Sequence, residues 1–369
     1  MYNKINPTHT IGPLSAFFLP QVMQIGIGFL SFQQIITKFS EQDGWLATLI
    51  SGLSTLFVMW IILRLLENER HFGRPDIFSI HRRIFGPWIG NVLTFILMSH
   101  VLLFSFAFLR SYIEILQVWI FPQLNSFTFS IIFCCIVWYI VMGGLRTISG
   151  VCLLSFIYLI PLFILSIFIV PHAHYENLMP LFDHTPLSIM RSCYETTHDY
   201  LGFELILYFY PFISQPEKAR KWAFRGVLTT IYIYTTILLL GIIYFSQGEM
   251  QNTIWPTITY WKSVRFPLFE HVDIIAIVIL LWVLIPNICL CSWILARGIK
   301  FTFPAIKMKH SLIGILVVLI TITCMVKNGL QVRTINNIYN GFGFIIIYFY
   351  LPLLLFCQWI KKKIGRQSA

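Results

Sequence analysis

Two glycines separated by one residue, Gly26-Ile27-Gly28, stand in the middle of the first long apolar run of the chain. Glycine destabilises a helix interior, so a pair at mid-membrane depth predicts that the helix opens and frees backbone N–H and C=O groups. Such groups are tolerated in a bilayer only where protein or a water-filled cavity surrounds them. The flanking polar residues are Gln21, Gln24, Ser31, Gln33 and Gln34. The pattern favours a ligand site inside a membrane over the close helix packing that small residues also allow.

A second polar feature is the segment Leu201-Gly202-Phe203-Glu204, which opens a later apolar stretch. Glu204 is the only carboxylate that we place within the body of a predicted span. A carboxylate is costly in hydrocarbon, so a functional role is expected: exchange of a proton, pairing with a cation or contact with a ligand amine. The alternative is a hydrogen bond that joins two helices. Asn287, beside the kink-forming Pro286, is a further candidate for the wall of the site, and Phe104 is a weaker one.

The polarity of the two predicted breaks suggests what they bind. Free N–H groups at the start of the second half of the first span lie at the positive end of a helix dipole, which suits a carboxylate. Freed carbonyls in the later span suit an ammonium group. Together they predict a zwitterionic amino acid as the ligand.

The composition is that of a polytopic membrane protein with an all-α fold. Of the 369 residues, 57% are hydrophobic and only 11% are charged, whereas a soluble domain carries about 25% charged residues. About 20 apolar residues cross the hydrocarbon as a helix, so we expect ten transmembrane helices. Their ranges are 12–37, 45–66, 90–109, 127–145, 148–170, 199–214, 224–245, 271–296, 311–326 and 336–360.

The basic residues lie mainly on one side of these spans. The net charge is +11, and the alternating loops divide the 26 Lys and Arg into 19 on one side and seven on the other. This asymmetry is the positive-inside pattern, and it predicts that both termini are cytoplasmic. It explains the basic charge without nucleic acid as a partner.

Ten spans without a large soluble insertion predict a single transmembrane domain over residues 1–369. Transporter folds often consist of two inverted halves with helices broken near the bilayer midplane. We therefore predict an inverted 5+5 repeat, with halves at approximately 12–170 and 199–360 and with helices 1 and 6 broken. Outside the spans, Asp76 is expected to cap a short helix at 77–85 that lies on the membrane surface.

Signatures of an enzyme are missing from the sequence. It has no metal-ligand spacing, no phosphate-binding glycine loop after a strand and no nucleophile elbow. Seven of the eight cysteines lie within or beside apolar runs, which argues against a disulfide framework. The first run has no small-residue cleavage site, so we expect a retained span. We expect no catalytic residues, no metal and no cofactor.

Several short motifs together resemble a known family. They are Ile25-Gly26-Ile27-Gly28-Phe29-Leu30-Ser31, Gln42-Asp43-Gly44-Trp45, Met142-Gly143-Gly144-Leu145, Gly202-Phe203-Glu204, Trp255-Pro256-Thr257 and the segment from Glu270 to Asp273. In this order they are similar to the B subunits of bacterial spore-germination nutrient receptors, which are permease-like members of the amino acid-polyamine-organocation transporter superfamily. The resemblance covers nearly the whole chain.

The resemblance implies a nutrient sensor in the inner membrane of a dormant spore, in contact with lipid and with two partner subunits. These partners are a membrane-embedded A subunit and a lipoprotein C subunit. A small nutrient, commonly an amino acid, would bind between spans 1, 3, 6 and 8. The residues expected near this pocket are Gly26, Ile27, Gly28, Phe104, Leu201, Gly202, Glu204 and Asn287.

Three hypotheses follow for the function. The first is a germinant receptor subunit in which the bound nutrient selects one arrangement of the two halves and so signals to the A subunit. The second is a proton-coupled amino acid transporter in which Glu204 cycles its proton. The third is a membrane scaffold with a vestigial site. The first two need the same pocket, so the sequence leaves them open.

Overall fold

The structure of the protein is a computed structural model that describes residues 9–264, 271–326 and 328–367. Glu270, which belongs to one of the family-like motifs, lies outside the described residues. Within them the secondary structure is helical, apart from one isolated parallel bridge between Ile11 and Ile213. An all-α fold is thus confirmed for this part of the chain.

The α-helices follow one another along the chain with short connections. They are α1 (Ser15–Gln24), α2 (Phe32–Ser40), α3 (Gly44–Glu69), α4 (Ile77–Trp119), α5 (Ser126–Met142), α6 (Leu145–Ile167), α7 (Pro186–Asp199), α8 (Ile206–Phe209), α9 (Pro216–Tyr244), α10 (Gln247–Asn252), α11 (Pro256–Ser263), α12 (Val272–Thr302), α13 (Met308–Met325), α14 (Gly329–Ile345) and α15 (Leu351–Gln367). The 3₁₀ turns are η2 (Ile27–Leu30), η3 (Glu41–Asp43), η4 (Val170–His172), η5 (Tyr175–Leu178), η6 (Phe203–Leu205) and η7 (Tyr210–Phe212). A π-helical turn, η8 (Ile346–Tyr350), joins α14 to α15.

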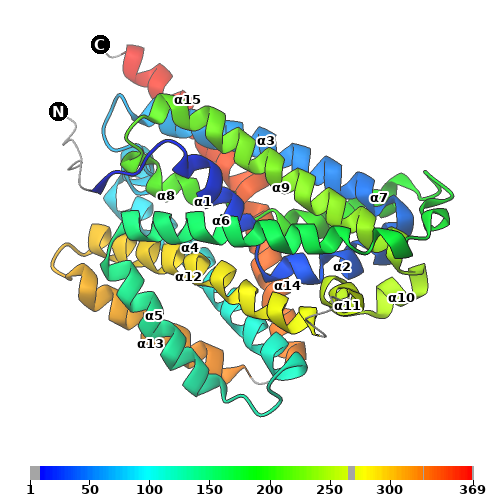
Figure 1. The fold of residues 1–369 in the computed structure, drawn as a ribbon. Helices are drawn as coiled ribbons and strands as arrows, with labels where there is room; N and C mark the ends of the chain where they lie inside the picture. The colour runs from blue at the N-terminus through cyan, green and yellow to red at the C-terminus, as the bar shows by residue number, and fades with distance from the viewer. Residues whose placement is uncertain (1–8, 265–270, 327, 368–369) are drawn as a thin grey trace.

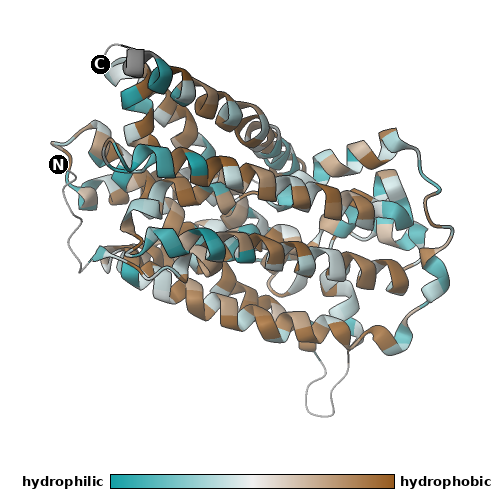
Figure 2. Ribbon diagram, turned by 90° about the horizontal axis from the view of Figure 1, so that it is seen from above, coloured by the Kyte–Doolittle hydropathy of each residue, from teal (hydrophilic) through white to brown (hydrophobic). Residues whose placement is uncertain are grey.

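The described helices are those of a multi-pass membrane protein. Seven helical segments are long and apolar enough to cross a membrane, and two shorter apolar helical segments lie at Ser126–Met142 and Phe203–Phe212. Apolar residues follow the length of the helices, whereas hydrophilic residues gather toward their ends (Figure 2). The polytopic fold class is confirmed, while the count of ten spans and the inverted repeat stay predictions.

The long helix α12 holds the bundle together. It packs against α4, α6 and α13, while α9 packs against both α1 and α3. α5 and α13 lie side by side at one edge of the bundle (Figure 1). α1 begins and α15 ends at the same end of the bundle (Figure 1). We call this end, which also carries Arg64, Arg297 and Lys362, the basic end.

The sixth predicted span differs from the structure at its start. The sequence pattern begins this span at residue 199 and leaves the preceding residues in an outer loop, but residues 186–199 form helix α7. Pro186 occupies its first turn, and the Thr185 hydroxyl caps it by accepting the Ser188 N–H at 3.3 Å. α7 packs against α2 and α3. Its buried positions are polar, among them Ser192, Thr196 and Thr197, so hydropathy alone does not reveal it.

The predicted short helix after Asp76 forms the start of α4. The Asp76 carboxylate does cap it, since Oδ1 accepts the Ser79 N–H at 2.9 Å, and Gly86 interrupts the helical backbone with φ of +79°. However, Ile77 and Phe78 are fully buried inside the protein. The start of this short helix therefore packs against other helices, while its position at the membrane surface stays a prediction.

Close packing between α1 and α9 depends on Gly226, and this contact is testable. A Cβ added to Gly226 would lie 2.5 Å from the Phe17 carbonyl oxygen, whereas a Cβ on Gly150 of α6 would meet no atom within 4 Å. We expect Gly226→Val to lower the thermal unfolding midpoint of the purified protein by several degrees, since overpacking costs about 1–3 kcal/mol. Gly150→Val is the matched control. Equal midpoints for the two variants would show that the α1–α9 contact is looser than described.

Candidate functional site

The first predicted break is present in the structure. The last hydrogen bond of α1 runs from the Ile25 N–H to the Gln21 carbonyl at 3.0 Å. Gly26 then leaves the helical region with φ of −126° and ψ of −147°, and the chain passes through η2 before α2 begins. A Cβ on Gly26 would lie 1.9 Å from Cε1 of Phe108 on α4. A side chain at this position would therefore require the Phe108 ring to move.

The second break lies between α7 and η6. Gly202 has φ of +119°, a conformation that side chains disfavour, and its N–H donates to Oε2 of Glu204 at 2.7 Å. Glu204 therefore caps the backbone that the break exposes. A Cβ on Gly202 would lie 2.7 Å from the carbonyl carbon of Met23. The two breaks are thus in direct contact, as the sequence hypothesis required.

Side chains from one break satisfy the backbone of the other. Gln24 Nε2 donates to the Tyr200 carbonyl at 2.8 Å, and the hydroxyl of Tyr234 on α9 donates to the Gln24 carbonyl at 3.0 Å. All three residues are buried. In hydrocarbon these carbonyls have no water to bond, so the interactions fix the two breaks relative to each other.

Two carboxylates are buried beside the second break. The Glu204 side chain has Oε1 at 3.5 Å from Nε2 of His100 on α4. Asp199, the last residue of α7, is only 5% exposed, and its Oδ1 has no hydrogen-bond partner in the described part of the chain. Nδ1 of His198 lies 3.7 Å from this oxygen. Each carboxylate therefore has an imidazole close to its less engaged oxygen.

Asp199 also contacts the first break, which the sequence did not predict. A Cβ on Gly28 would lie 2.8 Å from Oδ1 of Asp199. Asp199 is the first residue of the predicted sixth span, and the polar residues before it were assigned to a loop. The sequence signal that could have revealed this role is an acidic residue two positions before Leu201 of the break.

Helix α14 adds an aromatic wall that was not expected from the sequence. Tyr339 stacks on His100 with ring centroids 5.0 Å apart and meets Phe104 edge-on at 5.7 Å. Phe104 also stacks on Phe108 at 4.3 Å, and Leu201 packs against Gly343. The predicted residues Phe104 and Leu201 thus lie on an aromatic and aliphatic surface that joins α4, α14 and the second break.

The predicted residue Asn287 lies on α12, which packs against α1. Its side chain is fully buried, and neither its Nδ2 nor its Oδ1 has a hydrogen-bond partner among the described residues. Gln21 on α1 is likewise fully buried, and its Nε2 and Oε1 also lack a hydrogen-bond partner among the described residues. Both amides can donate to and accept from a bound polar group.

Arg297 of α12 ties the segment after the second break to the start of α4. Its Nη1 donates to the Tyr208 carbonyl at 2.5 Å, and its Nη2 lies 2.6 Å from Oδ2 of Asp76. The guanidinium also lies 4.5 Å from the ring centroid of Phe212. One cation thus joins α12 to the segment after the second break and to the start of α4.

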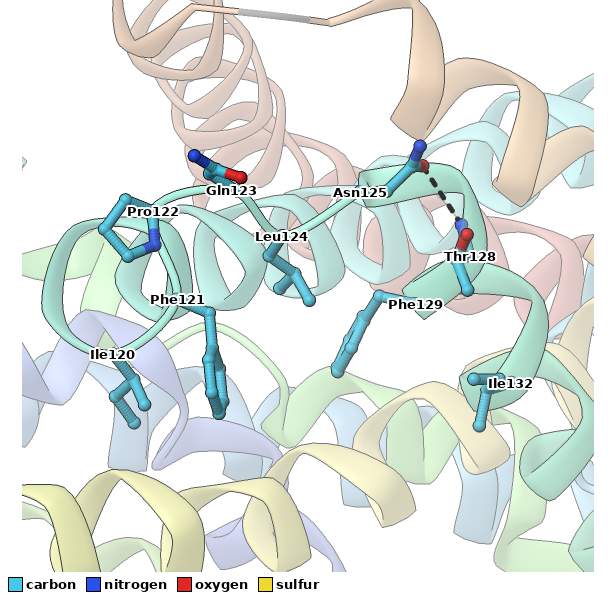
Figure 3. Close-up of a pocket in the computed structure, with 9 residues that line it drawn as sticks. All are labelled: Ile120, Phe121, Pro122, Gln123, Leu124, Asn125, Thr128, Phe129 and Ile132. Atoms are coloured by element: carbon cyan, nitrogen blue, oxygen red, sulfur yellow. Dashed lines mark hydrogen bonds between the residues drawn. The ribbon is translucent and has the colours of Figure 1, made fainter.

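Two open cavities lie away from the helix breaks. One, of about 670 Å³, lies where α4 ends and α5 begins; Phe121, Leu124 and Phe129 point into it (Figure 3). Its few polar lining atoms belong to residues such as Asn125, which caps α5. The other is a groove of about 450 Å³ between α3 and α15. Neither contains a residue predicted for the site.

Comparison with known protein families gives a match over most of the chain. A family model described as "Spore germination protein" matches residues 10–332. The chain belongs to this spore germination family. The resemblance inferred from the motifs is thereby confirmed.

Relatives in this family match over nearly their full length. The spore germination protein GerQB of Bacillus cereus is 32% identical over 97% of this chain and 98% of its own length. The spore germination protein YndE of Bacillus subtilis (strain 168) is 22% identical over 97% of this chain and 99% of its own length. The spore germination protein B2 of the same strain is 23% identical over 93% of each chain.

A solved structure shows the same fold. It is Mhp1, a nucleobase-cation-symport-1 family transporter, in a closed conformation with bromovinylhydantoin bound. The TM-score is 0.60 at 14% identity, over 92% of this chain and 78% of Mhp1. The family and the fold are those of permease-like membrane proteins and not of an enzyme, as the sequence indicated.

The contact between Gly26 and Phe108 provides a test of the first break. We expect Gly26→Ala to lower the thermal unfolding midpoint of the purified protein, because the added methyl group overlaps the Phe108 ring. Phe108→Ala in the same chain removes the overlapping atoms, so the double variant is expected to lose less than the sum of the two single losses. Strictly additive losses would contradict the described contact.

Proposed function

We propose that the chain is a nutrient germinant receptor subunit that binds a small nutrient, an amino acid, at the meeting point of the two helix breaks. The contact between the breaks, with Asp199 and Glu204 buried beside it, is the observation that carries this proposal. Family membership supports the role in germination. The ligand-binding residues that we propose are Gly26, Ile27, Gly28, Phe104, Leu201, Gly202, Glu204 and Asn287, to which we add Asp199.

The charges around the breaks favour a zwitterionic ligand. The backbone N–H groups of Ile27 and Gly28 lie at the start of η2, the first turn after the break, and they suit the ligand carboxylate. One oxygen of Glu204 is already engaged by the Gly202 N–H, whereas Oδ1 of Asp199 lacks a hydrogen bond within the described residues. Oε1 of Glu204 lacks one among them as well, but Oδ1 of Asp199 also lies against Gly28 of the first break, so we propose Asp199 as the acceptor for the ligand ammonium. Phe104 and Leu201 would contact an apolar side chain.

A receptor subunit also has to signal to its partner subunits whether a ligand is bound. A ligand shifts the balance between two arrangements only when it binds one of them more tightly. A nutrient held between the breaks contacts both α1–α2 and α7–α8, so it would favour one relative placement of these helices. We propose that an A subunit in the membrane detects this placement and that a lipoprotein C subunit completes the receptor. We place the receptor in the spore inner membrane, with both termini in the cytoplasm.

The second candidate is a proton-coupled amino acid transporter. It is favoured by the 3.5 Å contact between Glu204 and His100, across which a proton can be exchanged, and by the transporter fold. Uptake of labelled amino acids by the purified protein in liposomes distinguishes the two functions. Accumulation driven by a pH gradient would favour the transporter, and binding without accumulation the receptor.

A germinant screen tests the proposed role directly. Spores that lack this gene are exposed separately to each common L-amino acid, and germination is followed by the loss of optical density. We expect a selective loss of response to one or a few amino acids, with normal responses to the others. A response profile identical to that of the parent spores would refute the proposed function.

The role of Asp199 is tested by removing its charge. We expect Asp199→Asn to raise the half-maximal concentration of the effective amino acid by at least about tenfold, since a charged hydrogen bond contributes roughly 1.5–3 kcal/mol. Asp183→Asn, at an exposed site just before α7, is the matched control. Glu204→Gln is expected to impair the response. Unchanged concentration dependence in Asp199→Asn, at normal protein level, would remove Asp199 from the site.

A further inference from the structure

The groove between α3 and α15 at the basic end is a separate feature of the molecule. The two helices lie side by side along the edge of the bundle (Figure 1). The groove has a volume of about 450 Å³. Residues that line it include Phe57, Trp60, Arg64, Phe356, Trp359 and Lys362. It therefore combines apolar walls with two cations.

The two walls of the groove carry the same aromatic pattern. Phe57 stacks on Trp60 on α3, and Phe356 stacks on Trp359 on α15, each pair with ring centroids 6.0 Å apart. Phe57 is 62% exposed, and Phe356 and Trp359 are each 56% exposed. Tryptophan is enriched where hydrocarbon meets lipid headgroups. These pairs therefore mark the depth of a membrane interface on both sides of the groove.

The cations at the groove have no acidic partner in the described part of the chain. None of the ion pairs there involves Arg64 or Lys362. The nearby carboxylate of Glu69 is already engaged, at 2.7 Å, by Arg83. The positive charges of Arg64 and Lys362 are thus available to an anion.

Two polar side chains also line the groove. Asn68 Nδ2 donates to Oε1 of Gln358 at 3.1 Å, and Gln358 Nε2 donates to Oε2 of Glu69 at 3.3 Å. Both Asn68 and Gln358 line the groove. Along α3 the lining residues run from Phe57 and Trp60 through Arg64 to Asn68, which is the order of acyl chain, phosphate and headgroup in a phospholipid.

We propose that this groove binds one anionic glycerophospholipid of the membrane leaflet at the basic end. Its phosphate lies between Arg64 and Lys362, its headgroup reaches Asn68, and an acyl chain lies between the two aromatic pairs. Charge complementarity selects this occupant, because basic pockets between membrane helices attract anionic headgroups. The site is independent of the proposed nutrient site and of the role in germination.

Lipid retention by the purified full-length protein tests the proposal. The probes are palmitoyl-oleoyl phosphatidylglycerol and palmitoyl-oleoyl phosphatidylcholine, which share their acyl chains and differ in net charge. Native mass spectrometry of the protein with equal amounts of both is expected to show one phosphatidylglycerol bound with a preference of about tenfold or more, as two basic side chains would give. Equal retention of the two lipids would overturn the proposal.

Charge-removing variants identify the site. Arg64→Gln with Lys362→Gln is expected to abolish the preference, whereas Arg74→Gln with Lys309→Gln, which removes two exposed cations elsewhere, is expected to keep it. A preference that survives the first pair of substitutions would place the lipid elsewhere. Both double variants should retain the thermal unfolding midpoint of the parent in lipid-free detergent, because the four cations form no ion pair in the described structure.

Two further outcomes would show that the groove holds a different occupant. Soluble glycerol 3-phosphate that displaces phosphatidylglycerol at equal concentration would show a phosphate site without lipid specificity. A photo-crosslinking amino acid at position 356 that labels another protein subunit in native membranes, and no lipid, would show a helix–helix interface. Crosslinking to phosphatidylglycerol supports the proposal.

Discussion

The structure depends on one constraint: a helix that opens inside a bilayer frees backbone groups that must find partners within the protein. Gln24, Tyr234 and Glu204 supply these partners, and each bonds a backbone group at or beside a break. Gln24 beside the first break bonds the second, and Tyr234 of α9 bonds the first, so each break depends on a side chain from outside itself. The juxtaposition of the two openings is therefore a requirement of the fold before it is a feature of any ligand site.

Local backbone chemistry made the two breaks predictable. Gly26 and Gly202 interrupt apolar runs; the Phe108 ring fills the space beside Gly26, and the positive φ of Gly202 disfavours any other residue there. The apolar runs likewise predicted most helices to within a few residues. The family motifs then predicted a permease-like fold that the comparisons support.

The parts that the sequence did not predict depend on contacts between distant residues. Helix α7 has polar positions that hydropathy assigns to a loop, so Asp199 at its end was not recognised as buried. Tyr339 lies on α14, far along the chain from His100, and only the packing of α14 against α4 brings the rings together. The segment after Asp76 is amphipathic, and the sequence alone does not distinguish a protein neighbour from a lipid surface.

Arg297 has a consequence for how the molecule changes shape. Its guanidinium joins α12 to the Tyr208 carbonyl and to the Asp76 carboxylate, so three separate chain segments share one cation. Displacing any one of these segments costs the guanidinium a charged contact in a partly buried setting. One cation therefore couples α12, the second break and the start of α4 at this end of the bundle.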